Sequence, residues 1–368
     1  MLSKSIDGLT SIRFFAAFFV FFSHLEARWP LSGPHFITNI ISQGPVAMSL
    51  FFILSGFILT YNYKNMQPHR EYSQFIMRRF ARIYPVYILA ACLTLYWLGV
   101  PLHGDFQALA KIVFLMFTNI FIIQAWFPAS FAYWNDGLSW SLSVEAFCYL
   151  LFPAILYYFL KLTDKARKNI LIICYLCTIL PSISFVLLDP KPIFPTIYAL
   201  PIFRLPEFIM GIICCLIFFD TKTCKSIQFK FMLTVLFLLG YLALFGNSFP
   251  VIYIIHNFIV IPCFCLIIYY IAHADSQFPF NLLKNKYLKF LGESSYSFYL
   301  MQLLPLKWGV TLVAHYHFFA KHHWFLAITL FVINLLLATA CYKLIEKPMR
   351  KYLLNYSSDK KMGLNEVT

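Results

Sequence analysis

The chain has 368 residues, of which 61% are hydrophobic and only 12% are charged, and its mean hydropathy is +0.73. This composition excludes a soluble globular protein, because apolar stretches long enough to cross about 30 Å of hydrocarbon recur along the chain. The net charge is +14, but 22 of the 29 lysine and arginine residues fall in segments that one membrane topology places on the same side. The charge therefore encodes orientation, and no nucleic-acid partner is expected.

Eleven apolar stretches follow one another along the chain. They cover residues 10–28, 45–63, 83–99, 109–127, 143–160, 169–188, 200–219, 231–246, 251–272, 294–312 and 324–343. If all of them crossed the membrane, the basic segments could not share one side, and the conflict falls at 109–127. We therefore predict an all-α polytopic membrane protein with about ten transmembrane helices, one re-entrant or interfacial segment at 109–127 and both termini cytoplasmic. Residues 1–350 are expected to form one transmembrane domain, and 351–368 a disordered cytoplasmic tail.

The first apolar stretch contains two ionisable residues, Arg13 and His24. They are eleven positions apart, which is about three helical turns, or about 16 Å, with almost no net rotation. Both should therefore lie on one face of a helix. Ionisable groups inside a membrane are costly and usually functional. The alternative is that Arg13 snorkels to the inner headgroups and His24 to the outer ones.

Glu145 lies at the outer end of a later stretch, in Trp140-Ser-Leu-Ser-Val-Glu145. The predicted topology places it at a depth similar to that of His24. A carboxylate beside a histidine can hold the imidazole tautomer and stabilise its protonated form, as a general base requires. The alternative is an acidic residue at a helix start, capped by Ser141 or Ser143.

Three arginines cluster before the third stretch, in Arg78-Arg79-Phe-Ala-Arg82-Ile-Tyr-Pro85. Their spacings of three and four residues bring them together on a helix. Guanidinium groups bind phosphate oxygens bidentately, so the cluster is a candidate phosphate site at the cytoplasmic face. The alternative is a cluster that stops translocation and contacts anionic membrane lipids.

Smaller signals favour structural roles. Ser55 and Gly56 lie in the middle of the second stretch, where small residues usually allow close helix packing. Arg204 and Glu207 are spaced to form an ion pair within the membrane. No metal is expected at the histidines of the last outer loop, because firm ligand geometry and nearby carboxylates are missing. These histidines are His315, His317, His322 and His323.

Together these segments resemble the acyltransferase-3 family of membrane O-acyltransferases. Arg13 with His24 resembles its R-x10-H signature, and the segment ending at Glu145 resembles its WSLSVE motif. Further matching segments, in the family's order, are Phe51-Phe-Ile-Leu-Ser55-Gly56-Phe57, Arg78-Arg79-Phe-Ala-Arg82-Ile-Tyr-Pro85, Arg204-Leu-Pro-Glu-Phe208, Leu291-Gly-Glu-Ser-Ser-Tyr296-Ser-Phe-Tyr299-Leu300 and Glu346-Lys-Pro348. One position departs: the late motif often ends Tyr-Leu-x-His, and this chain has Gln302 there. We interpret Gln302 as a hydrogen-bonding or structural position.

The resemblance implies an enzyme that uses acetyl-CoA, or a related acyl-CoA, from the cytoplasm to acylate sugars of cell-envelope glycans. It implies that His24 is the base or an acyl relay, with Glu145 and Arg13 as its partners in the catalytic set. The residues expected to bind the donor are Arg78, Arg79, Arg82, Ser55 and Tyr299. Of these, the three arginines would meet the phosphates of CoA.

We therefore predict an O-acetyltransferase of the bacterial cytoplasmic (inner) membrane. Its acceptor would be a surface polysaccharide, such as a lipopolysaccharide O-antigen, or a lipid-linked precursor. In the mechanism that we favour, His24 removes the proton from a sugar hydroxyl as the hydroxyl attacks the thioester; a covalent acyl relay is the alternative. A transporter or flippase for such glycans is the rival function, since an intramembrane Arg, His and Glu would suit a proton relay. The sequence has no inverted repeat that would favour that rival.

Overall fold

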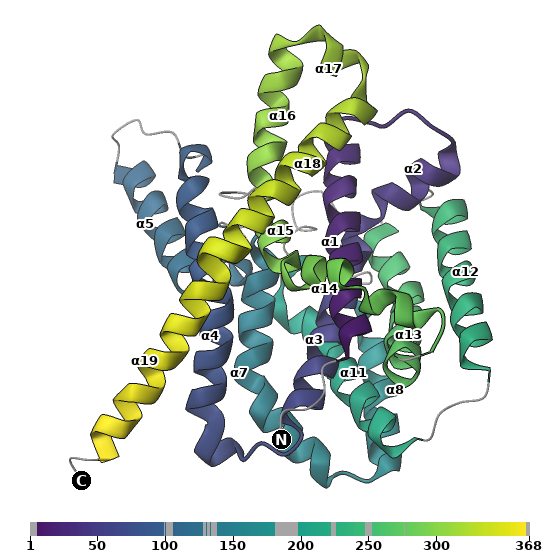
Figure 1. Cartoon of the computed structure of the whole chain (residues 1–368), viewed down its shortest axis with the longest axis vertical. Coiled ribbons are helices and arrows are strands. Elements are labelled where there is room, and N and C mark those ends of the chain that lie inside the picture. Colours follow the sequence, from purple (N-terminus) through teal and green to yellow (C-terminus); the bar gives the residue numbers. More distant parts are fainter. Residues whose placement is uncertain are drawn as a thin grey trace.

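The computed structural model describes residues 6–98, 100, 106–127, 130, 133, 138–180, 198–221, 226–246, 252–275 and 277–365. Regular structure in these residues is helical, which confirms the predicted fold class, and the helices form a bundle around α1, α3 and α15 (Figure 1). The helices are α1 (Asp7–Arg28), α2 (His35–Ser42), α3 (Ala47–Tyr63), α4 (Pro68–Leu93), α5 (Phe106–Ile120), α7 (Trp140–Lys161), α8 (Asp164–Cys177), α11 (Pro201–Asp220), α12 (Ile227–Phe245), α13 (Ile252–Ala274), α14 (Lys286–Glu293), α15 (Ser295–Met301), α16 (Leu303–His315), α17 (His317–Lys321), α18 (His323–Cys341) and α19 (Lys347–Asn365).

Seven helices of the described residues are long and apolar enough to cross a membrane. Three other predicted crossings fall short of that length or composition, each for a local reason. The arginines of α4 occupy its first half, and α8 ends at Cys177, with the end of its apolar stretch outside the described residues. The stretch 294–312 is divided at Gln302 into α15 and α16. The sequence therefore contains more apolar stretches than the described part of the structure has unbroken helices able to span a membrane.

The stretch 109–127 forms the 15-residue helix α5 and a short 3-10 turn. A helix of that length rises about 22 Å, which is less than the hydrocarbon thickness. Its polar residues bond to neighbouring elements: Tyr87 Oη donates to Asn119 Oδ1 at 3.0 Å, and Gln124 Nε2 donates to the carbonyl of Ser139 at 2.9 Å. Protein groups thus satisfy several of the polar atoms of a segment that we predict not to cross, although Gln124 Oε1 has no hydrogen-bond partner.

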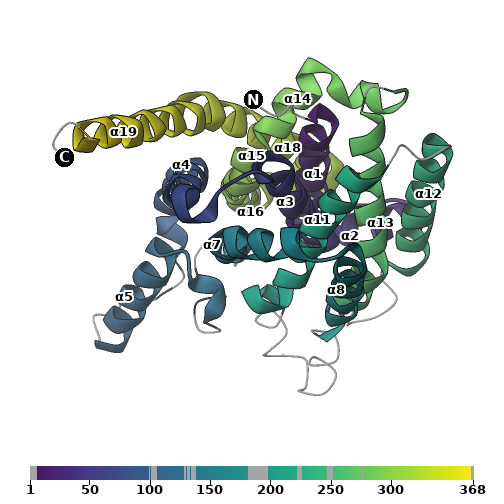
Figure 2. The ribbon, with the colours of Figure 1, turned by 90° about the horizontal axis from the view of Figure 1, so that it is seen from below.

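The helices α3 and α11 approach each other closely at two glycines. A Cβ at Gly56 would collide with the carbonyl oxygen of Phe208, and a Cβ at Gly211 with that of Ile53. Figures 1 and 2 both show the two helices side by side at the centre of the bundle. The small residues predicted to allow close packing therefore do so, and they hold α3 against α11.

Replacing Gly211 with alanine is expected to destabilise the protein by about 1–3 kcal/mol, because the added methyl group must force two backbones apart. Gly240 in α12 is the matched control, since a Cβ there meets nothing within 4 Å. Gly240→Ala should be neutral or stabilise by up to about 1 kcal/mol through helix propensity. Thermal unfolding in detergent measures both; equal melting temperatures for the two variants would contradict the close contact.

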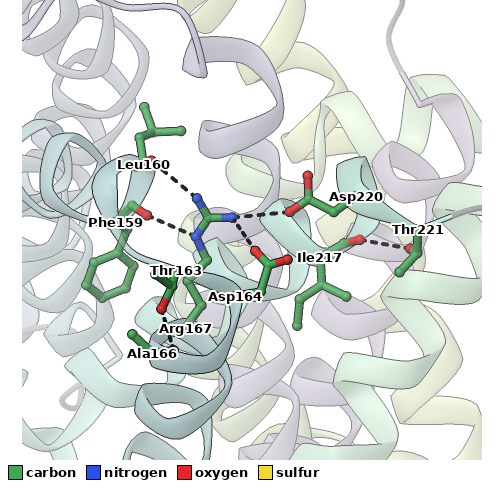
Figure 3. Close-up of polar contacts among 9 residues, drawn as sticks. All are labelled: Phe159, Leu160, Thr163, Asp164, Ala166, Arg167, Ile217, Asp220 and Thr221. Carbon is green, nitrogen blue, oxygen red and sulfur yellow. Dashed lines mark hydrogen bonds and ion pairs between the residues drawn. The ribbon is translucent and has the colours of Figure 1, made fainter.

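Arg167 joins three helix ends on the side of the bundle where α7, α8 and α11 meet (Figure 3). Its guanidinium donates to the carbonyls of Phe159 and Leu160, in the last turn of α7, at 3.0 and 3.3 Å. It also pairs with Asp164 at 3.3 Å and Asp220 at 3.1 Å. One arginine thereby caps α7 and ties it to its neighbours.

The C-terminal part of the chain is one long helical segment. A π-helical turn at Tyr342–Glu346 connects α18 to α19 without a break. Residues 351 to 365, for which we predict a disordered tail from their polarity, belong to the helix α19 in this structure. The helix α19 runs beside α4, and its first six side chains are exposed.

Candidate active site

A cavity lies among five helices in the middle of the bundle. Its volume is about 60 Å³, which is room for a few water molecules or an acetyl group. The lining side chains come from α1, α3, α4, α7 and α15. Those that carry a polar group are Arg13, Ser55, Arg82, Ser141, Glu145, Tyr149, Ser295, Tyr296 and Tyr299. The structure thus brings together five of the eight residues that the sequence singled out, from five separate helices.

Arginines outnumber carboxylates around this cavity. Glu145 interacts electrostatically with Arg82, Arg13 and Arg79. Glu346, from the π-helical turn, interacts with Arg82, Arg350 and Arg13. Four arginines against two glutamates leave a net charge of +2 in a setting with little water, where like charges repel strongly. Such an arrangement favours the binding of an anion.

Two tyrosines with serine partners line opposite parts of the cavity. The hydroxyl groups of Tyr149 and Ser55 are 3.2 Å apart, which links α7 to α3. Tyr299 Oη donates to the carbonyl of Leu138 at 2.6 Å and lies 3.0 Å from Ser141 Oγ. These bonds fix the aromatic walls, so Ser55 and Tyr299 lie where a donor group in the cavity would touch them.

A second hollow opens next to the cavity, at the junction of α3 and α4. It has a volume of about 330 Å³, and Lys64 and Arg78 are among its lining residues. Arg79 stands between the two hollows: its Nη2 donates to Tyr63 Oη at 3.1 Å on one side, and its guanidinium lies 6.0 Å from the Tyr149 ring on the other. Its buried Nε has no hydrogen-bond partner, which leaves one charged donor for a ligand.

His24 is placed at the outer end of the same face of α1, outside the set of described residues that line the cavity. Two neighbours fix its depth. Gly44 packs against Ser23, and Met48, four residues further along the chain, lines the cavity. Four helical residues rise about 6 Å, so His24 lies roughly one turn outward from the cavity.

Glu145 lies deeper than its sequence position suggested. We expected it beside His24, and the structure places it on the cavity wall with Arg13, which is three turns inward along α1. The reason is that α7 begins at Trp140, so Glu145 is already in the second helical turn. Its electrostatic partners are therefore arginines.

Sequence reasoning did not assign Tyr149, Ser141, Ser295 and Tyr296 of the cavity wall to the site, nor Glu346 and Arg350 beside it. Tyr149 follows Glu145 by four residues, so helical spacing alone could have put it on the same face. Glu346 belongs to a segment that resembles a family motif, but neither it nor Arg350 was assigned to the site. Ser297 Oγ donates to Glu346 Oε2 at 2.5 Å, which holds this buried carboxylate in place.

The predicted ion pair of Arg204 and Glu207 is confirmed, at 2.8 Å with both side chains almost fully buried. Asn257 Nδ2 adds a bond to Glu207 Oε1 at 3.2 Å. The pair lies near Trp140, behind the cavity wall, and has a structural role there. Among the residues that the structure describes, no group of three or more His, Cys, Asp and Glu side chains could hold a metal ion.

Comparison with known proteins assigns the chain to a family. The family model described as "Acyltransferase domain" (acyltransferase-3) matches residues 6–343, nearly the whole chain. The chain belongs to the acyltransferase-3 family. It is an acyltransferase of a helical, membrane-embedded type.

Proteins similar to this chain are named as acyltransferases or acetyltransferases. The chain is 27% identical to Acyltransferase MdmB of Streptomyces mycarofaciens over 84% of its own length and 81% of the relative's. It is 28% identical to Putative acetyltransferase ORF330 of Acidianus two-tailed virus over 82% of this chain and 84% of the relative. It is 24% identical to O-acetyltransferase OatA of Staphylococcus aureus over 95% of this chain but only 58% of that relative. No solved structure matches the chain.

Proposed function

We propose that this acyltransferase is an O-acetyltransferase of the bacterial inner membrane. In this proposal it moves an acetyl group from cytoplasmic acetyl-CoA to a sugar hydroxyl of a cell-surface polysaccharide, such as a lipopolysaccharide O-antigen, or of its lipid-linked precursor. The chain would cross the membrane about ten times, with both termini in the cytoplasm. The observation that carries the proposal is the net positive cavity beside the arginine-lined hollow, because acetyl-CoA is a polyanion with a small uncharged reactive end.

The two hollows suit the two ends of that donor. The larger one, with Lys64 and Arg78, has room and charge for the phosphate-bearing end. The smaller one admits only a narrow group such as the thioester arm. Arg79 lies between them with an unpartnered Nε, so a donor that spans both hollows would pass this guanidinium. In this arrangement Arg82, Ser55 and Tyr299 surround the arm.

His24 is the proposed general base. The sugar hydroxyl would approach from the outer side and give its proton to the imidazole while its oxygen attacks the thioester carbon. The carbon–sulfur bond then breaks, and CoA leaves as the thiolate, which takes up the proton. Arg13 and Glu145 would act on the donor side of this reaction, where their mutual attraction holds the guanidinium toward the cavity.

The test is acetyl transfer by the purified protein in detergent or liposomes. With acetyl-CoA and an acceptor glycan, wild-type protein should release free CoA and leave an acetyl ester on the glycan, measured by thiol titration and by NMR of the glycan. A protein that carries the glycan across a liposome membrane without consuming acetyl-CoA would instead be the transporter or flippase. That outcome would overturn the proposal.

A further inference from the structure

Gln302, at the junction of α15 and α16, has a buried side-chain amide that makes no hydrogen bond. Its exposed fraction is 0%, and neither Nε2 nor Oε1 has a hydrogen-bond partner. An unsatisfied buried polar group is costly in a folded protein, so a sequence retains one only with a compensating reason. The two free atoms therefore indicate that this amide bonds to something the protein itself does not supply.

The depth of Gln302 follows from its neighbours on α1. Gly292 packs against the backbone of Thr10, and the two segments run outward side by side. Gln302 is ten residues beyond Gly292, so it lies near the depth of Val20, which is ten residues beyond Thr10. Phe298 fits this register, since its ring lies 5.6 Å from those of both Phe14 and Phe21. Gln302 is thus about one turn short of His24.

The direction in which the Gln302 side chain points follows from helical geometry, because the backbone of Gln302 is still α-helical, with φ −58° and ψ −26°. At 100° per residue, its side chain points about 40° from that of Phe298 and about 60° from that of Tyr299. Phe298 packs on α1, and Tyr299 lines the cavity. The amide therefore points between α1 and the outer end of the cavity.

The face of α1 opposite this amide is narrow. Between Arg13 and His24 it carries Ala17 and Val20, while most of the other residues of that stretch are phenylalanines. Ala17 and Val20 are both buried, and every residue from Phe14 to Phe22 is apolar, so this face of α1 offers no polar side chain between the arginine and the histidine. Across from this apolar face, the buried and unpartnered amide of Gln302 can direct a hydrogen bond toward a group that enters from the cavity.

We infer that Gln302 Nε2 donates a hydrogen bond to the thioester carbonyl oxygen of the acyl donor, next to His24. The inference rests on the proposed function and adds a residue to it. When the sugar oxygen bonds to the carbonyl carbon, the carbonyl π electrons move to its oxygen, and the amide N–H stabilises the negative charge that forms there. The charge returns to the carbonyl as the sulfur leaves. A preorganised donor in a dry site suits this task, because it needs no rearrangement during the reaction.

Replacement with methionine separates this role from a structural one. Methionine has a similar shape and no polar atoms to satisfy, so Gln302→Met should leave the melting temperature unchanged or raise it. If Gln302 stabilises the negative charge that forms on the carbonyl oxygen, its replacement should lower kcat by about 10²–10³-fold. The KM for acetyl-CoA should stay close to the wild-type value. Opposite movements of stability and kcat are not expected of a packing residue.

Leu306→Met is the matched control, one turn outward on α16 and equally buried. It should keep both wild-type stability and wild-type kcat. Gln302→Met with a wild-type kcat, in protein whose wild-type form transfers acetyl groups, would overturn the inference and mean that the amide holds a buried water only. If the wild-type protein transfers no acetyl group, the proposed function fails instead, so the two failures are distinguishable.

Discussion

Replacing His24 with alanine is expected to lower the rate of acetyl transfer by about 10²–10⁴-fold, which is the usual contribution of a general base. His24 lies on the face of α1 that carries Arg13 further inward, about one turn outward from the cavity. The variant should still bind acetyl-CoA with unchanged affinity, because the donor's phosphates meet arginines at the other end of the site. Release of CoA and equilibrium binding of acetyl-CoA measure the two effects separately.

His35→Ala is the control for this experiment, since His35 is an exposed histidine at the start of α2. It should transfer acetyl groups at the wild-type rate. Undiminished transfer by His24→Ala, at matched expression and melting temperature, would remove His24 from the mechanism. Loss of donor binding together with the rate would instead assign His24 to the donor site.

Replacing Arg82 with alanine is expected to weaken acetyl-CoA binding by about 10–100-fold, the value of a hydrogen bond to a charged group. Arg82 lines the cavity and is a charged neighbour of both Glu145 and Glu346. The difference from wild type should narrow as the salt concentration rises, because salt screens the attraction between the positive charge of Arg82 and the polyanionic donor. Titration calorimetry at two ionic strengths measures both quantities.

Two further variants show whether the effect comes from the position and the guanidinium group of Arg82 or from its charge alone. Arg82→Lys keeps the charge that compensates the two glutamates, so it should fold as wild type does, but it loses the bidentate fork and some donor affinity. Arg70→Ala removes the same charge from an exposed position of α4 and should leave donor binding unchanged. Equal affinities for Arg82→Ala and Arg70→Ala would reduce the arginine cluster to a signal for membrane topology.

Much of this site could be predicted because charged residues in an apolar sequence are conspicuous. Arg13, Arg82 and Glu145 each stand out from apolar surroundings, and the positive-inside rule assigns the arginine cluster to one side. Ser55 and Gly56 could likewise be assigned to close packing from residue size alone. Such features depend only on local composition and helical spacing.

Other features depend on where helices begin and how they lie against one another. Glu145 was expected at the depth of His24 because the start of α7 was known only approximately, and a shift of one turn changes its partner to Arg13. Glu346 lies in a π-helical turn, which the hydrophobic periodicity of the sequence does not predict, and from there it interacts with Arg82 and Arg13. The unsatisfied state of Gln302 is a property of its surroundings, so it becomes visible only in three dimensions.

The glycine contact between α3 and α11 also determines which wall of the cavity can move. Gly56 and Gly211 bring two backbones together, so α3 has little freedom to tilt or slide. The cavity must widen to admit and release a thioester arm, and the opposite wall belongs to α4. Pro85 interrupts the hydrogen bonding of α4 beside Arg82, which makes that point a natural hinge. Opening is therefore expected to swing the half of α4 that precedes Pro85, with its arginines, away from a fixed α3.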